Sequence, residues 1–257
     1  MPPMDGSARP YRLVVAPAPE LAEQLAEQVL AERLAFRPQP LGLATGATME
    51  PFYAALSRRV AALSEEQQQR LRQTWCSFNL DEYVGLGPED PESFTATMTR
   101  LLRTPLGLDH ACVHCPDGLA DDPVAEARRY RLSLAAAGGL GLQLLGLGRN
   151  GHVGFNEPPC GPEAGTRLID LTAATREQNA FAFAGQASAV PAQAITLGLA
   201  EILSARQLVL LVTGAAKAEI LARALRQPPT ADVPASWLQR HPDLLVLADP
   251  AAAAGLL

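Results

Sequence analysis

Residues able to carry out acid–base chemistry follow two apolar runs of this chain. Asp81 and Glu82 end one run, and His152 and Glu157 lie in a glycine-rich stretch after another. A carboxylate enclosed by apolar groups has a raised pKa and can take a proton from carbon, and histidine can both accept and donate a proton. Neighbouring strand residues point to opposite faces, so one acid should face a cleft and the other solvent or a partner. The alternatives are a solvated acidic turn and a structural histidine.

Two turns of small residues could hold an anion such as phosphate. The first is Thr45, Gly46, Ala47 and Thr48, placed between an apolar run and a helical pattern. A helix N-terminus exposes backbone N–H groups and its dipole favours an anion, although Thr48 could instead be only a helix cap. The second turn leads to Lys217, the only lysine in the chain, in the first turn of another predicted helix. A lysine there opposes the dipole, which suggests either an intervening anion or a solvated surface position.

The glycines before His152 have the spacing of a dinucleotide-binding fingerprint. Gly146, Gly148 and Gly151 match G-x-G-x-x-G after an apolar run. That fingerprint needs a helix to begin at the third glycine, but residues 152–162 contain three prolines and two further glycines. We therefore interpret the stretch as a loop that lets backbone approach a ligand, and not as a dinucleotide site.

The cysteines favour neither a metal site nor a redox site. Cys112 and Cys115 form a C-x-x-C pair with His110 nearby, but no second pair completes a zinc set and a turn follows where a redox motif would open a helix. The N-terminal residues lack the apolar segment of a signal peptide. The sequence therefore predicts a cytoplasmic protein without a metal.

Composition predicts a globular protein and excludes several classes. The chain has 257 residues, of which 48% are hydrophobic and 19% charged, so it is neither disordered nor collagen-like. Its net charge is −6 and its arginines are scattered, which argues against nucleic-acid or membrane partners. The longest apolar stretch, residues 132–147, is interrupted by polar residues and glycines and does not read as a membrane span.

The elements that must position these residues alternate between short apolar runs and amphipathic helical patterns. Such alternation predicts an α/β fold with an open, mostly parallel twisted sheet and helices on both faces, a Rossmann-like three-layer arrangement. Ligands of such sheets bind at the carboxyl ends of the strands, where all the clusters above fall. The predicted strands are Arg12–Ala16, Leu41–Thr45, Thr74–Leu80, Cys112–His114, Gln143–Leu147, Leu208–Thr213 and Leu244–Leu247. The predicted helices are Ala18–Leu34, Met49–Ala61, Ser64–Leu71, Pro91–Leu102, Pro123–Ala136, Ala194–Leu203, Ala215–Leu225 and Pro234–Gln239.

The organisation predicted is one domain over residues 1–257, since no linker or repeat divides the chain. Residues 148–191 differ from the rest, because glycines and prolines open them and their periodicity is weak. Long irregular segments within such domains are usually binding loops or lids, so we predict a lid at about residues 165–190.

These motifs together resemble those of glucosamine-6-phosphate deaminases (isomerases). The specific strings are N-L-D-E-Y-V-G-L at 79–86 and G-H-V-G-F-N-E-P at 151–158, supported by the segments at 43–48, 91–94 and 212–217. The resemblance covers residues 12–249. Relatives with the same fold include galactosamine-6-phosphate isomerases, 6-phosphogluconolactonases and sugar-phosphate-sensing domains of repressors.

The resemblance implies a cofactor-free enzyme that acts on C–N bonds and converts glucosamine 6-phosphate and water to fructose 6-phosphate and ammonia. By the family's pattern His152 opens the sugar ring with the help of Asn150 and Glu157, and Asp81 moves a proton from C2 to C1. The turn at 45–48 and Lys217 would hold the phosphate. The expected partner is a small amino-sugar phosphate, and a homo-oligomer is compatible with the sequence.

Two positions depart from the family's pattern. Asn150 stands where many members carry aspartate, so the carboxylate relay to His152 would rest on Glu157 alone. Phe181 stands where the lid usually presents a phosphate-binding arginine, and Arg176 or Arg167 could replace it. A galactosamine 6-phosphate substrate is the main alternative, followed by a lactonase and a non-catalytic sugar-phosphate sensor.

Overall fold

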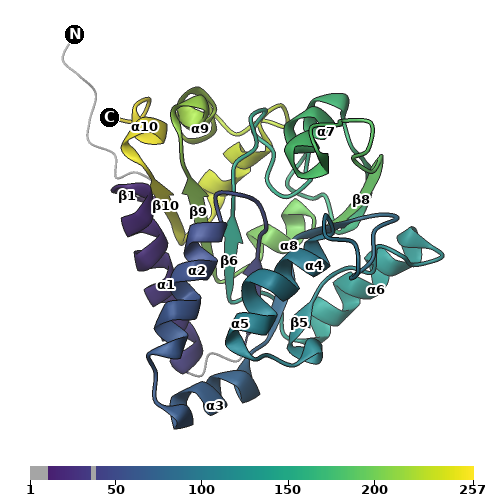
Figure 1. Ribbon diagram of the computed structural model, residues 1–257. Coiled ribbons are helices and arrows are strands. Elements are labelled where there is room, and N and C mark those ends of the chain that lie inside the picture. The colour runs from purple at the N-terminus through teal and green to yellow at the C-terminus, as the bar shows by residue number, and fades with distance from the viewer. Residues whose placement is uncertain (1–10, 36–38) are drawn as a thin grey trace.

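The core of the molecule is a seven-stranded parallel sheet with helices on both faces, as predicted (Figure 1). The computed structural model describes residues 11–35 and 39–257. Apolar side chains of the inner strands are buried against the covering helices, which is typical of parallel sheets, while those of the edge strands β1 and β5 are half-buried. The strands in spatial order are β1 (Arg12–Val15), β10 (Leu244–Ala248), β9 (Gln207–Val212), β6 (Leu142–Leu145), β2 (Leu41–Leu43), β3 (Ser77–Asn79) and β5 (Val113–His114).

The long helices occupy the residue ranges that were predicted from hydrophobic periodicity. The helices α1 (Ala18–Leu34) and α6 (Pro123–Ala136) have the predicted bounds. The predicted strand at 74–80 starts only at Ser77, because α3 (Glu65–Thr74) continues three residues beyond its predicted end. The remaining helices are α2 (Glu50–Ala61), α4 (Phe94–Met98), a π-helical turn (Thr99–Arg103), α5 (Thr104–Leu106), α7 (Ala173–Asn179), α8 (Leu199–Leu203), α9 (Ala218–Arg226) and α10 (Pro250–Ala253), with 3-10 turns at His110–Cys112, Ala180–Phe183, Ala215–Lys217 and Pro234–Arg240.

A second, antiparallel sheet was not predicted from the sequence. It consists of β4 (Asp81–Tyr83), β8 (Gln193–Thr196) and β7 (Arg167–Asp170), with β8 in the centre. The predicted helix 194–203 is therefore wrong over its first half, because residues 194–196 pair with both neighbours and the helix begins only after Gly198. Strands of three or four residues are too short for their periodicity to be told from that of a helix.

The segment predicted as a lid contains β7, α7 and the 3-10 turn at 180–183. It packs through a small aromatic cluster that is separate from the main core, in which Phe183 lies edge-on to Tyr83 at 5.7 Å between ring centroids. The side-chain amide of Asn179 also donates to the Tyr83 hydroxyl at 2.9 Å. These contacts attach the segment to β4, the strand that carries Asp81.

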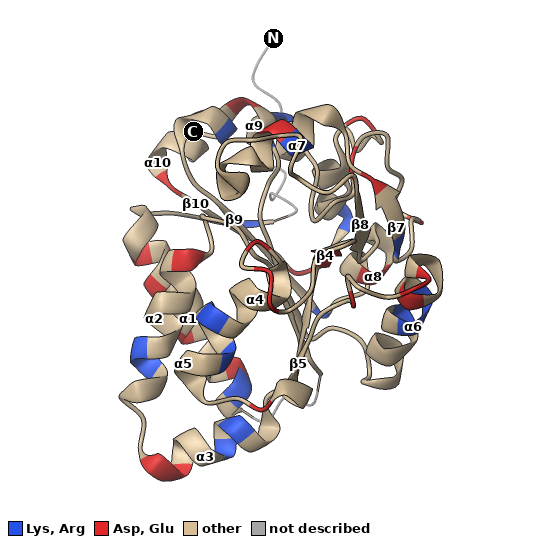
Figure 2. Cartoon of the chain, turned by 45° about the vertical axis from the view of Figure 1, so that its right-hand side comes forward, with Lys and Arg blue, Asp and Glu red and all other residues tan. Residues whose placement is uncertain are grey.

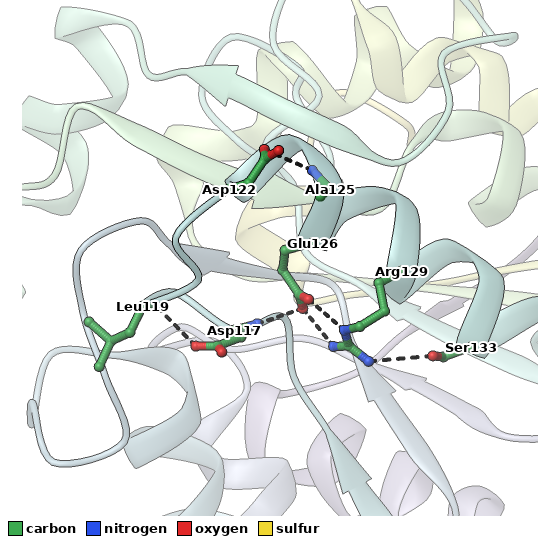
Figure 3. A network of polar contacts seen from close by, with 7 residues as sticks. All are labelled: Asp117, Leu119, Asp122, Ala125, Glu126, Arg129 and Ser133. Carbon is green, nitrogen blue, oxygen red and sulfur yellow. Dashed lines mark hydrogen bonds and ion pairs between the residues drawn. The ribbon is translucent and has the colours of Figure 1, made fainter.

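A polar network fixes the loop that leads into α6 (Figure 3). The Asp122 carboxylate caps α6 by accepting from the N–H groups of Val124 and Ala125, both at 3.0 Å. Glu126, buried on the first turn, accepts from the Asp117 N–H at 2.8 Å and pairs with Arg129. The loop in turn supports the residues after β4, because the Gly85 N–H donates to the Gly118 carbonyl at 2.7 Å.

Charged side chains of both signs are spread over the outer helices (Figure 2). Ion pairs between them, such as that of Arg59 with Glu23 at 3.0 Å, are partly exposed and contribute little to stability. In residues 11–35 and 39–257, no helix is both long and apolar enough to cross a membrane.

Candidate active site

Most of the predicted site residues meet in a cleft of about 680 Å³ at the carboxyl edge of the parallel sheet. The turn Thr45–Thr48 follows β2, Asp81 follows β3, His152 follows β6 and Lys217 follows β9, and all of them line the cleft. The parallel order of these strands explains the meeting, since their carboxyl ends lie on one edge. Asn150 and Glu157 lie behind His152 and do not line the cleft.

Asp81 is a buried carboxyl group, 6% exposed, that faces the cleft. Desolvation raises its pKa to about 8, and the neighbouring Glu82 charge adds to the rise. The conjugate base of such a group is a much stronger proton acceptor than an ordinary aspartate. The environment of Asp81 therefore suits proton abstraction from carbon.

Glu82 points away from the cleft, as expected for the neighbour of Asp81, and of the two predicted alternatives it faces a partner, the start of α4, and not solvent. Its carboxylate accepts from the N–H groups of Tyr83 and Phe94, both at 2.9 Å, and from the N–H and hydroxyl of Thr95, both at 2.7 Å. Burial raises the pKa of Glu82, and these hydrogen bonds oppose the rise. Glu82 thus fixes the start of α4 against the strand that carries Asp81.

A hydrogen-bonded relay connects His152 with Glu157 through Asn150. The Asn150 amide donates to the Glu157 carboxylate at 2.9 Å, which leaves its oxygen to accept from Nδ1 of His152 at 2.7 Å. This order assigns the proton to Nδ1 and leaves Nε2 with a free lone pair. Glu157 therefore acts on His152 indirectly, and its carboxylate also accepts from the Thr172 hydroxyl at 3.2 Å.

His152 is neutral near pH 7. Burial lowers its pKa to about 4, against an opposing effect of Glu157, while the positive charge of Lys217 lowers it further. A neutral imidazole can take a proton from one hydroxyl oxygen and return it to another oxygen within one cycle.

Gly148 provides the space that the His152 ring occupies. A Cβ at this position would lie 2.3 Å from the Cε1 and Nε2 atoms of that ring. The third glycine of the pattern, Gly151, opens no helix, since the next helical element in the chain is α7. The glycines therefore make room for the His152 ring and shape its loop. They do not form a dinucleotide site, in agreement with the sequence-based interpretation.

The turn at 45–48 presents free donors to the cleft. The N–H groups of Gly46, Ala47 and Thr48 donate to no atom of the described residues, while the Met49 N–H closes the turn on the Gly46 carbonyl at 2.8 Å. Thr48 does not cap α2, whose N-cap is Met49 without a side-chain hydrogen bond. The cap-only interpretation of Thr48 is therefore wrong.

Lys217 is half-buried and ends the 3-10 turn Ala215–Lys217, so α9 begins after it, three residues later than the predicted helix start at Ala215. Its ammonium group donates to the Leu147 carbonyl at 2.7 Å and lines the cleft. Burial lowers the pKa of Lys217, and the positive charge of Arg149 lowers it further.

Arg176 and Arg167 do not reach the cleft, which corrects the expectation that one of them replaces a lid arginine. Arg176 donates to the carbonyls of Val190 and Ser188 at 3.0 and 3.2 Å, so its hydrogen bonds lie within the lid segment and connect α7 with the end of that segment. Arg167 donates to the Asn156 side-chain oxygen at 2.9 Å. Phe181 does line the cleft, with 69% of its surface exposed.

Sequence reasoning missed two arginines that line the cleft, Arg100 and Arg149. Arg149 directly precedes Asn150 in the glycine loop, so its position in the sequence could have indicated it. Arg100 lies in the π-helical turn, and no sequence signal pointed to it. Among the described residues, no group of three or more His, Cys, Asp or Glu side chains could hold a metal ion.

Comparison with known proteins decides the family. The model of the family described as glucosamine-6-phosphate isomerases/6-phosphogluconolactonase matches residues 13–246. The chain belongs to this family. Curated members similar to it include a glucosamine-6-phosphate deaminase of Streptomyces avermitilis, 42% identical over 95% of this chain and 92% of that protein. Another, from Rhodopirellula baltica, is 41% identical over 96% of this chain and 97% of that protein.

Solved structures of the family share the fold described above. A monomeric glucosamine-6-phosphate deaminase of the NagB superfamily superposes with a TM-score of 0.87 at 35% identity, covering 95% of this chain and 99% of the other. A 6-phosphogluconolactonase from Leishmania guyanensis has a TM-score of 0.74 at 21% identity over 96% and 99% of the two chains, a likeness of fold alone.

Proposed function

We propose that this family member is a glucosamine-6-phosphate deaminase, which converts glucosamine 6-phosphate and water to fructose 6-phosphate and ammonia. The observation that carries the proposal is the pairing, in one cleft, of a carboxyl group with a raised pKa and a neutral histidine with a free Nε2. Relatives that are about 40% identical over nearly the whole chain carry the same name.

The histidine serves the oxygen chemistry of ring opening. Nε2 of His152 takes the proton of the C1 hydroxyl and returns it to the ring oxygen as the C1–O5 bond breaks. The Asn150 oxygen, held by Glu157, keeps the ring in the tautomer that leaves Nε2 free. The open-chain aldehyde is then the substrate of the carboxylate.

The carboxylate serves the carbon chemistry of isomerisation. Deprotonated Asp81 takes the proton from C2, an enol-type intermediate forms, and the proton is delivered to C1. The resulting imine at C2 reacts with water and releases ammonia, so that fructose 6-phosphate remains. Every step is a proton transfer or a hydrolysis, so this reaction is redox-neutral and requires no redox cofactor.

The phosphate is bound by the backbone donors and the cation that line the cleft. The unpaired N–H groups at 46–48 precede α2, a helix of twelve residues whose dipole favours an anion at that end. The Lys217 ammonium group lines the same cleft.

We also propose that residues 1–257 act as one domain with a lid at about 165–190, in the cytoplasm. The lid segment contributes Phe181 and Asn179 to the cleft, so its movement would alter access to Asp81. Size-exclusion chromatography with light scattering distinguishes a monomer from the homo-oligomer that the sequence allows.

An ammonia-release assay with three substrates tests the proposal. We expect turnover of glucosamine 6-phosphate and a slower reaction, or none, with galactosamine 6-phosphate. Faster ammonia release from galactosamine 6-phosphate would show that galactosamine 6-phosphate is the preferred substrate. Hydrolysis of 6-phosphogluconolactone without ammonia release from either amino sugar would make the protein a lactonase, and ligand-induced thermal stabilisation without any turnover would make it a sensor.

A further inference from the structure

The cleft contains two cations that no carboxylate neutralises. Lys217 and Arg149 both line it, and neither forms an ion pair with any residue the structure describes. The Lys217 ammonium donates to the carbonyl of Leu147, two residues before Arg149, and the charge of Arg149 is near enough to lower the pKa of Lys217. Like charges kept together without a counter-ion repel each other, so this arrangement costs free energy until an anion binds between them.

The other charges of the cleft do not supply that counter-ion. Glu50 is paired with Arg100 at 4.0 Å. Asp81 is largely protonated near pH 7 because burial raises its pKa to about 8. Glu92 lines the mouth beside α4 and contacts neither cation within ion-pair distance.

The lid offers no cation of its own to the cleft. The lid residues that line it are Gln178, Asn179, Phe181 and Ala182, none of which is charged. Arg149 instead lies where the glycine loop meets the lid, since its backbone N–H donates to the Gln178 side chain at 3.3 Å. Its own side chain is exposed and donates no hydrogen bond to the described residues, which leaves the guanidinium available to a ligand.

We propose that Arg149 is the second cation for the substrate's phosphate, opposite Lys217. Arg149 and Lys217 then clamp the anion from the loops after β6 and β9, without any charge from the lid. A guanidinium can form two parallel hydrogen bonds with phosphate oxygens, whereas the ammonium acts as a point charge. The inference deepens the proposed function and rests on it only for the identity of the sugar.

Because Lys217 is the only lysine, amine labelling reports on this site without any turnover. The experiment labels the protein with an amine-reactive reagent and quantifies the Lys217 peptide by mass spectrometry, separately from the N-terminal peptide. Inorganic phosphate and fructose 6-phosphate are the probes. Each variant is compared with its own unprotected rate, because removal of Arg149 changes the pKa of Lys217 itself.

We expect phosphate to protect Lys217 in the unmodified protein, and Arg149→Gln to raise the half-protecting concentration about tenfold, the loss of one charge-assisted contact. The matched control is Arg128→Gln, at an exposed position on α6 outside the cleft, which should leave protection unchanged. Glu177 of α7 lines a second pocket together with Arg149. The variant Glu177→Gln tests whether the role of Arg149 is instead to interact with this acid.

Unchanged protection in Arg149→Gln overturns the inference, as does a loss of protection in Arg100→Gln instead. If Glu177→Gln loses as much protection of Lys217 as Arg149→Gln does, then Arg149 has a structural role where the glycine loop meets the lid. That result would also overturn the inference. Protection that follows the expected order in a protein without deaminase activity would refute the proposed function but not the role of Arg149.

Discussion

A single amide, that of Asn150, determines which nitrogen of His152 faces the cleft. Its oxygen is committed to Nδ1 because its nitrogen is bound to Glu157. The identity of His152, Asp81 and Glu157 as candidates could be read from residue types after apolar runs. Residue types did not reveal the relay through Asn150 or the inward direction of Glu82. Both depend on contacts between segments that sequence spacing does not encode.

Asn150→Asp should raise the pKa of His152. A carboxylate in place of the amide oxygen stabilises the protonated imidazole, so we expect the pKa to rise from about 4 by about 1 to 2 units. The measurement is an NMR titration of the imidazole signals, with the other three histidines as internal references. An unchanged His152 titration would show that the Nδ1 contact with residue 150 does not exist in solution.

Asp81→Asn should stabilise the fold at alkaline pH. The folded pKa of about 8 lies above the ordinary value of 3.8, so the folded state binds more protons than the unfolded state between those values. The stability contributed by protonated Asp81 is therefore present below about pH 4 and is lost as the pH rises through 8.

Denaturant unfolding at several pH values measures this effect. We expect the free energies of unfolding of Asp81→Asn and the unmodified protein to differ little at pH 4 and to diverge by about 5 kcal/mol in favour of the variant at pH 9. Asp121→Asn, at an exposed position, is the control and should show no such divergence. A constant difference across the range would contradict the raised pKa.

At the scale of elements, the sequence predicted what long periodic segments can encode. The parallel strands and the helices α1 and α6 follow from apolar runs and from periodicity over more than ten residues. The antiparallel sheet escaped prediction because its strands have three or four residues and their partners lie far away in the chain. This small sheet matters to function, since β4 begins at Asp81 and β7 begins the lid segment.

Gly148→Ala tests how the loop after β6 holds the histidine. The backbone of Gly148 has no positive φ, and the three atoms nearest to an alanine Cβ all belong to the His152 ring, the first at 2.3 Å. We expect displacement of the ring to lower kcat by about 100-fold or more, the contribution typical of one acid–base group. Gly161→Ala, which meets no atom within 4 Å, is the matched control for kcat and for thermal stability. Full activity in Gly148→Ala would contradict the assigned position of the His152 ring.

At the scale of the whole molecule, the fold gathers residues from four parallel strands at one edge of the sheet. That gathering was predictable, because ligands of open α/β sheets bind at the carboxyl ends of the strands. The way the lid covers the cleft was not predictable. The lid residues that line the cleft come from a short helix and a 3-10 turn, and the positions of both depend on contacts with Tyr83. The result is a cleft with its base, its histidine and its anion donors on separate segments of the chain.

The central claim is that Asp81 transfers a proton during deamination of glucosamine 6-phosphate. The most direct test follows fructose 6-phosphate and ammonia together, by NMR and by an ammonia assay, for the unmodified protein and for Asp81→Asn. We predict equimolar products from the unmodified protein and a rate lower by at least about 100-fold in the variant, which should still be stabilised by the substrate in a thermal shift assay. Turnover by Asp81→Asn within about tenfold of the unmodified rate, or ammonia release without fructose 6-phosphate, would contradict the claim.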